Sequence, residues 1–179
     1  WQHSAEYTAP VAALGENEVF FYDGVLDGLY DAWTRRGLVP KSGDTGYLKS
    51  LDIRTGKPIW PSGTARAVTW LGVSSQDGVL IASNKKGMEA WDGKSGQPLW
   101  EKDADAKGFL GHPEELWDKV ILWNDRIIDQ RGPGAAYDVK TGEPLMKDHP
   151  LTGQPTPWGF TKTGHHCSYA VAIPHMLTF

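Results

Sequence analysis

A short motif that recurs three times without gaps constrains the fold of this chain more than any other feature of its sequence. The three copies are Ser50–Trp60, Ala90–Trp100 and Ala136–Met146. Each copy holds Asp, Thr or Ser, Gly and Pro in the same register, and the glycines at 56, 96 and 142 are separated by 40 and 46 residues. Because a fixed period of this size is typical of propellers and related arrays, we expect a chain built from repeated units.

The residue types within the motif predict a β-hairpin. The Asp carboxylate can cap a turn, and the Gly falls where a tight turn needs a positive φ angle. The Pro suits an outer strand, where no backbone N–H is needed for pairing. The final Trp is large enough to cover the turn or the seam to the next unit, so Trp60 and Trp100 are expected to be largely buried. The predicted structural docking residues are Asp52, Gly56, Trp60, Asp92, Gly96, Trp100, Asp138 and Gly142.

Short apolar runs precede each hairpin and read as further strands. These runs are Glu18–Tyr22, Gly78–Ser83 and Lys119–Trp123, and Ala65–Gly72 is expected to form an innermost strand. Four short strands in about 40–45 residues match one blade of a β-propeller. The sequence therefore predicts an all-β protein with blades of four antiparallel strands.

The period also divides the chain into units. We expect a blade at 1–63 with an insertion at 23–45, a blade at 64–103, a blade at 104–150, and the start of a further blade at 151–179, joined through a linker at Gly153–Pro157. These units make about three and a half blades, whereas propellers typically have four to eight. An open array leaves strand edges and blade faces uncovered. We therefore expect part of a larger propeller, with the remaining blades of the parent chain or another protein subunit as its partner.

The Ala-x-Asp-x-x-Thr-Gly-x-x-x-Trp hairpin resembles the repeat of the PQQ-like, or quinoprotein alcohol dehydrogenase-like, β-propellers. The resemblance covers about residues 47–146 and implies that the Trp and the Gly dock adjacent blades. Ser50 and Met146 depart from the pattern, because they replace its Ala and its final Trp. The segments 149–153 and 158–179 are similar to large secreted bacterial members of this group, which implies a fragment of such a protein and a periplasmic or secreted location.

The resemblance also raises the possibility of a quinone cofactor, which in the dehydrogenases of this group lies above a calcium ion, often beside a disulfide between adjacent cysteines. The chain has one Cys, so it cannot form that disulfide by itself. No set of Glu, Asn and Asp matches the calcium ligands residue by residue. No cofactor is therefore predicted, and PQQ with calcium remains the alternative.

Two clusters of polar residues are weak candidates for chemistry. His165, His166, Cys167 and His175 include metal-ligand types, but adjacent residues on a strand point to opposite faces, and no closed ligand set is evident. Acidic residues near a histidine could act in acid–base chemistry, although solvated loop charges explain them equally well. These residues are Asp103, Asp105, His112, Glu114 and Glu115.

Composition excludes two broad classes of function. With 18 Lys and Arg against 22 Asp and Glu, the formal net charge is −4, so no basic surface for nucleic acid is expected. No apolar run approaches the roughly 20 residues of a membrane-spanning helix. The sequence favours a non-catalytic extracytoplasmic propeller segment that serves as a scaffold or binding surface. The alternative is part of a PQQ-dependent oxidoreductase of the alcohol or sugar dehydrogenase type, with catalytic residues on blades outside this sequence.

Overall fold

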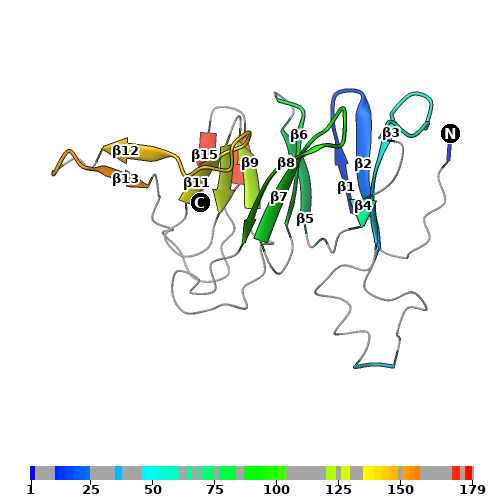
Figure 1. The fold of residues 1–179 in the computed structure, drawn as a ribbon, viewed down its shortest axis with the longest axis horizontal. Helices are drawn as coiled ribbons and strands as arrows, with labels where there is room; N and C mark the ends of the chain where they lie inside the picture. The colour runs from blue at the N-terminus through cyan, green and yellow to red at the C-terminus, as the bar shows by residue number, and fades with distance from the viewer. Residues whose placement is uncertain are drawn as a thin grey trace.

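The computed structural model shows a set of antiparallel β-sheets lying side by side (Figure 1). It describes residues 1–2, 11–24, 35–37, 46–60, 64–65, 68, 70–74, 77–83, 87–103, 120–123, 126–129, 135–148, 151–157, 171–173 and 176–178. Within these ranges every regular element is a β-strand. The predicted all-β class with four-stranded antiparallel blades is confirmed, and the chain is part of a β-propeller.

Two complete four-stranded sheets come first along the chain. The first contains β1 (Val11–Leu14), β2 (Glu18–Asp23), β3 (Tyr47–Asp52) and β4 (Thr64–Ala65) in that order. The second contains β5 (Trp70–Ser74), β6 (Val79–Ser83), β7 (Gly87–Asp92) and β8 (Pro98–Asp103) in that order. Each strand pairs antiparallel with the next one in sequence, which is the meander expected of a propeller blade.

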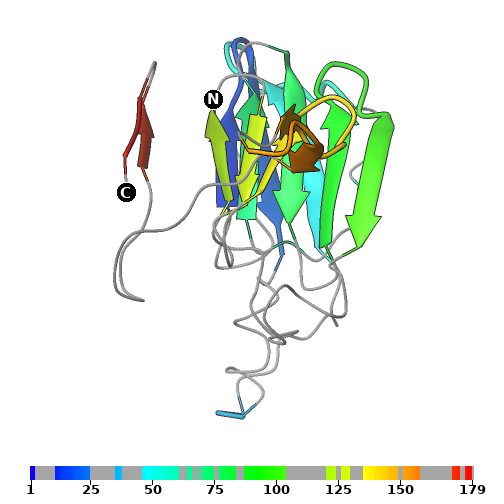
Figure 2. The ribbon, with the colours of Figure 1, turned by 90° about the vertical axis from the view of Figure 1, so that its left-hand side faces the viewer.

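The third sheet has three strands among the described residues, in the order β11-β10-β9. They are β9 (Val120–Trp123), β10 (Arg126–Asp129) and β11 (Ala135–Asp138). Two further strand pairs follow: β12 (Met146–Asp148) with β13 (Pro155–Pro157), and β14 (Val171–Ile173) with β15 (Met176–Thr178). β1, β5 and β9 are the first strands of the three sheets, and contacts run in series from β1 to β5, from β5 to β9 and from β9 to β14. The units are therefore arranged around a shared inner edge, and Figure 2 shows the first three sheets one behind another.

The middle sheet is buried on both faces, which explains the continuous apolar run of β6. Val79 and Ile81 pack in a cluster with β9–β11, whereas Leu80 and Ala82 pack in a cluster with the first sheet. Successive residues of a strand point to opposite faces, so a strand between two neighbours must be apolar at every position. The strand thus contributes to two apolar clusters, one shared with the sheet on each side.

The structure corrects three details of the sequence interpretation. Thr64–Ala65 pairs with β3 of the first sheet, so the first sheet extends past residue 63 and the innermost strand of the second begins at Trp70 instead of Ala65. The strand Val11–Leu14 was not predicted. Residues within Gly153–Pro157 are not a linker, because Pro155–Pro157 forms β13. In each case the prediction used the residue pattern of one short segment. The sheet to which a strand belongs depends on pairing partners that are distant in the sequence.

Candidate functional site

The candidate site is the row of turns that follows the third strand of each sheet, together with the tryptophans that cover them. In the second sheet the Asp92 Oδ1 accepts hydrogen bonds from the Lys94 N–H at 3.1 Å, the Ser95 N–H at 2.7 Å and the Ser95 hydroxyl at 2.8 Å. The Gly96 N–H donates to the Asp92 carbonyl at 2.8 Å. This side-chain cap satisfies the backbone donors of the turn without a neighbouring strand.

The same bonds recur at the other two turns, at Asp52 and at Asp138. The predicted positive φ angle is present at all three glycines: 67° at Gly56, 70° at Gly96 and 66° at Gly142. Glycine is the residue that adopts this conformation without steric cost, so the turn geometry follows from the local sequence alone.

Hydrogen bonding to the charged form lowers the pKa of the capping carboxylates. For Asp92 the Ser95 backbone N–H is the largest cause, and it lowers the pKa below the ordinary value of 3.8. For Asp52 the Thr55 hydroxyl is the largest cause, and the pKa again lies below 3.8. Both turns are therefore held by carboxylates that stay ionised at neutral and mildly acidic pH.

Replacing Asp92 by Asn should lower the free energy of unfolding at pH 7 by about 1 kcal/mol, because an amide oxygen accepts these bonds more weakly than a carboxylate. The folded-state pKa of Asp92 is depressed, so its contribution is present above the unfolded pKa and is lost as the pH falls through the folded value. Denaturant titrations should therefore show the difference between wild type and variant shrinking below about pH 4. Glu101→Gln, at an exposed position of β8, is the matched control; a difference for Asp92→Asn that is the same at pH 7 and pH 3 would contradict the interpretation.

A tryptophan from one sheet lies over the turn glycine of the next. The Trp60 Nε1 donates to the Gly93 carbonyl at 3.0 Å, and a Cβ atom added at Gly96 would lie 2.8 Å from Trp60 Cδ2. The Trp60 ring also packs against Phe20 with centroids 5.8 Å apart, and its side chain is 5% exposed. Glycine is therefore required at position 96 for two reasons: the backbone has a positive φ angle, and the indole lies against the Cα where a side chain would be.

The next seam repeats this geometry with a less buried ring. The Trp100 Nε1 donates to the Val139 carbonyl at 3.0 Å, and a Cβ at Gly142 would lie 2.7 Å from Trp100 Cδ2. Trp100 is intermediate in burial, whereas Trp60 is 5% exposed. The charged Lys102 side chain lies beside Gly142 at this seam. At the seam between the first and second sheets, the aromatic ring of Phe20 packs beside Trp60.

Trp1 makes the same contact on the first turn, which the sequence interpretation missed. Its Nε1 donates to the Ile53 carbonyl at 2.9 Å, and a Cβ at Gly56 would lie 2.5 Å from Trp1 Cδ2. Trp1 has no Asp, Gly and Pro before it in this sequence, so no repeat could be aligned to reveal it. Three consecutive turns therefore each hold an indole, from Trp1, Trp60 and Trp100.

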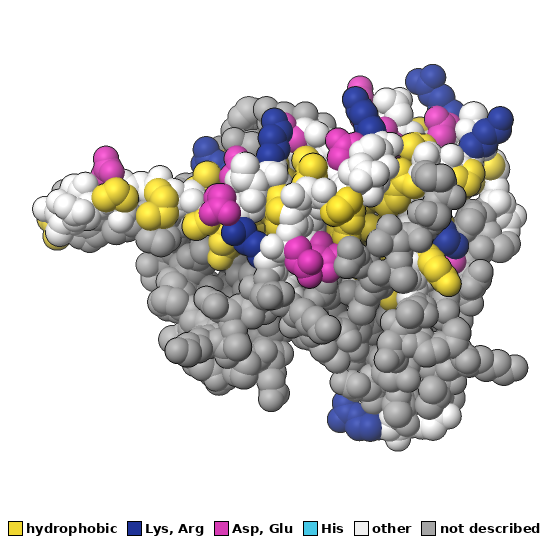
Figure 3. Space-filling view, in the orientation of Figure 1, with side chains coloured by type: hydrophobic (Ala, Val, Ile, Leu, Met, Phe, Trp, Pro, Cys, Tyr) yellow, Lys and Arg dark blue, Asp and Glu magenta, His cyan; other side chains and the backbone are white. Residues whose placement is uncertain are grey.

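Ion pairs add to the contacts between the second and third sheets. The Lys102 Nζ lies 3.2 Å from Glu143 Oε1, and the Lys140 Nζ lies 2.6 Å from Asp77 Oδ1. Figure 3 shows Lys, Arg, Asp and Glu side chains mixed along the rim formed by the turns. In each pair one side chain is mostly exposed, Glu143 in the first and Lys140 in the second, so solvent screens the attraction in part.

One departure from the repeat leaves a buried polar atom. Ser50 occupies the position of Ala90 and Ala136, is 2% exposed, and its Oγ has no hydrogen-bond partner among the described residues. A buried hydroxyl without a partner costs about 1–3 kcal/mol. Ser50 thus marks a position where the structure is not optimised for stability.

Replacing Ser50 by Ala should raise the free energy of unfolding by about 1 kcal/mol, because it removes the unpaired hydroxyl and restores the residue found in the other two repeats. Thermal or denaturant unfolding measures the change. The control is Ser95→Ala, which removes a hydroxyl that bonds to Asp92 and should destabilise. Destabilisation by Ser50→Ala would show that the hydroxyl is satisfied in solution.

The weak metal candidates His165, His166, Cys167 and His175 all lie outside the described residues, as do Asp105, His112, Glu114 and Glu115. Asp103 ends β8. In the part of the chain that the structure describes, no three His, Cys, Asp or Glu side chains are grouped to hold a metal ion.

The turns, the seams and the blade topology define a class of protein, a β-propeller built from PQQ-like repeats. A family profile described as "Outer membrane protein assembly factor BamB" matches residues 44–157. The chain belongs to this family, and its resemblance to PQQ-like propeller repeats is confirmed.

Among the solved structures that resemble this chain are two propellers of low sequence identity. The Dos1 propeller aligns with a TM-score of 0.47 and 12% identity over 89% of this chain and 35% of its own. BamB from Moraxella catarrhalis aligns with a TM-score of 0.34 and 16% identity over 74% of this chain and 45% of its own. The chain thus spans less than half the length of either protein. No curated protein matches it, and the described residues contain no helix that is long and apolar enough to cross a membrane.

Proposed function

We propose that this chain is a segment of an extracytoplasmic β-propeller without catalytic activity of its own, which serves as a scaffold and a protein-binding surface. The observation that carries the proposal is the use of the repeat residues. The recurring Asp carboxylates cap their own turns, and the recurring Trp rings lie on the turn glycines of the next sheet. Fold alone does not specify a function, and such residues build a platform.

Family membership supports the location and the type of partner. The family is described as an outer membrane protein assembly factor, so we propose that this protein acts outside the cytoplasm, periplasmic or secreted, and contacts other polypeptides. Within this proposal, residues 1–65, 66–103 and 104–150 form blades, and 151–179 begins the next. The first boundary follows Ala65 because Thr64 and Ala65 pair with β3. The eight repeat residues and Trp1 dock consecutive blades.

Two assays of the full-length protein test the proposal. Incubation with PQQ and Ca²⁺ should give no dye-linked alcohol or sugar oxidation, and turnover that depends on both additives would contradict the scaffold function. Crosslinking in intact cells, followed by mass spectrometry, should join the exposed lysines of the turns to other polypeptides. Lys57 and Lys94 are suitable positions because both are exposed. Crosslinks confined to the protein itself would count against a binding surface.

A further inference from the structure

The hairpin formed by β12 and β13 carries a fourth turn with the Thr/Ser-Gly-x-Pro sequence of the other three, which the period of the repeat did not reveal. It has His149 at the position of their capping Asp. Thr152-Gly153-Gln154-Pro155 parallels Ser95-Gly96-Gln97-Pro98, but it follows Gly142 by only 11 residues. Gly153 has a positive φ angle of 65°, as the other turn glycines do. The Gln154 N–H lies 3.3 Å from the Thr152 hydroxyl oxygen, which matches the 3.3 Å bond from Gln97 to Ser95.

This turn differs from the others in having no indole on it. At Gly56, Gly96 and Gly142 an added Cβ would meet a tryptophan ring, whereas at Gly153 no atom of the described residues lies within 4 Å. Residues 151–155 are all exposed, and Leu151 is 90% exposed. The turn therefore has the glycine face that receives an indole elsewhere, and this face is open.

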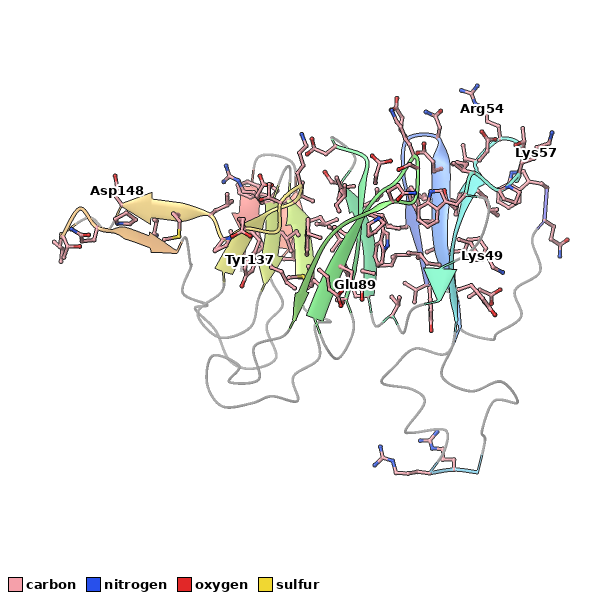
Figure 4. The ribbon with its side chains drawn as sticks, in the orientation of Figure 1. Lys49, Arg54, Lys57, Glu89, Tyr137 and Asp148 are labelled. Carbon is pink, nitrogen blue, oxygen red and sulfur yellow. The ribbon has the colours of Figure 1, made fainter. Side chains whose placement is uncertain are left out.

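The position of the hairpin prevents the preceding repeat from filling this face. The indole that covers a turn comes from the last residue of the preceding motif: Trp60 covers the turn at Gly96, and Trp100 covers the turn at Gly142. The motif that precedes Gly153 ends at Met146, which carries no indole. Met146 pairs with Pro157 within the same hairpin and is 53% exposed. The hairpin, marked by Asp148 in Figure 4, extends away from the sheets, and Figure 3 shows hydrophobic side chains exposed on it.

We infer that the Thr152–Pro155 turn is a docking site for a tryptophan on an exposed strand of a partner protein. The inference rests on the proposed scaffold function and gives it a site and a ligand chemistry. The occupant is an indole because the three described turns that share the Thr/Ser-Gly-x-Pro sequence and the positive φ of glycine each hold an indole in contact with that glycine. Exposed Leu151 and Met146 on the same hairpin supply apolar surface beside the turn for the rest of the partner strand.

A peptide with the sequence of the chain's own docking strand tests the inference. The probe is a dye-labelled peptide of residues 96–103, Gly-Gln-Pro-Leu-Trp-Glu-Lys-Asp, and its binding to the full-length protein is followed by fluorescence anisotropy. We expect saturable binding that weakens at least tenfold when the peptide tryptophan is replaced by alanine. Equal binding of the two peptides, or no binding, would overturn the inference.

Two matched variants place the binding on the hairpin. Gly153→Asn keeps a residue that tolerates positive φ but puts a side chain where the indole would lie, and it should weaken peptide binding at least tenfold. Gly78→Asn is the control, because Gly78 has the same φ of 65° and no atom within 4 Å, yet lies in the turn between β5 and β6. Unchanged binding to Gly153→Asn would overturn the site. If peptide binding is unchanged but the lysines of the turns still crosslink to other polypeptides, the scaffold function is supported and only this inference is rejected.

Discussion

Replacing Trp60 by alanine is expected to lower the free energy of unfolding by about 4 kcal/mol, the range for truncating a large buried aromatic side chain. Trp60 is 5% exposed, packs on Phe20 and covers Gly96 of the next sheet. Its removal opens a cavity at the seam and leaves the Gly93 carbonyl without its indole donor. Denaturant titration followed by circular dichroism measures the loss.

Trp60→Phe separates packing from hydrogen bonding at this seam. Phenylalanine keeps an aromatic ring against Phe20 but cannot donate to the Gly93 carbonyl, so about half of the loss is expected. A loss below about 1 kcal/mol for Trp60→Ala would show that the indole does not hold the two sheets together.

Replacing Gly96 by alanine should cost about 3 kcal/mol, from two separate effects. The φ angle of 70° is unfavourable for alanine by about 1–2 kcal/mol, and the added Cβ would lie 2.8 Å from the buried Trp60 ring. The ring cannot move easily because Phe20 and the Gly93 carbonyl hold it. Thermal unfolding of the variant gives the total.

Gly78→Ala is the control for the backbone effect. Gly78 has a φ angle of 65°, and no atom of the described residues lies within 4 Å of an added Cβ, so alanine there should cost only the backbone strain, about 1 kcal/mol. The excess at Gly96 is the contact with the indole. Equal losses at the two glycines would mean that the indole is absent from this position in solution.

The turns could be predicted from sequence because every interaction that forms them is local. Asp92, Ser95 and Gly96 lie within five residues, and their hydrogen bonds and φ angle require no distant partner. The buried strand at Val79–Ser83 could also be predicted, since an uninterrupted apolar run between turn residues indicates a strand covered on both faces.

The remaining features depend on contacts that a linear pattern does not encode. Ala65 and Trp70 lie in one apolar run, yet the first belongs to β4 of the first sheet and the second to β5 of the next. The Trp1 contact could not be predicted because no copy of the motif precedes Trp1 in this sequence. The Gly153 turn was not predicted because its spacing from Gly142 differs from the 40 to 46 residues that separate the other turns. A search for the four-residue turn alone, without the 40-residue spacing, would have found the latter.

Coupling between Trp60 and Gly96 tests the central claim that consecutive sheets are joined by an indole packed on a turn glycine. A double-mutant cycle compares the wild type with Trp60→Ala, Gly96→Ala and the double variant, each measured by denaturant titration at one temperature. Without the indole, alanine at 96 meets no ring, so the double variant should lose about 5 kcal/mol rather than the sum of about 7 kcal/mol, a coupling of about 2 kcal/mol. Losses that add within about 0.5 kcal/mol would mean that the two residues do not touch, and would contradict the arrangement of the sheets as docked propeller blades.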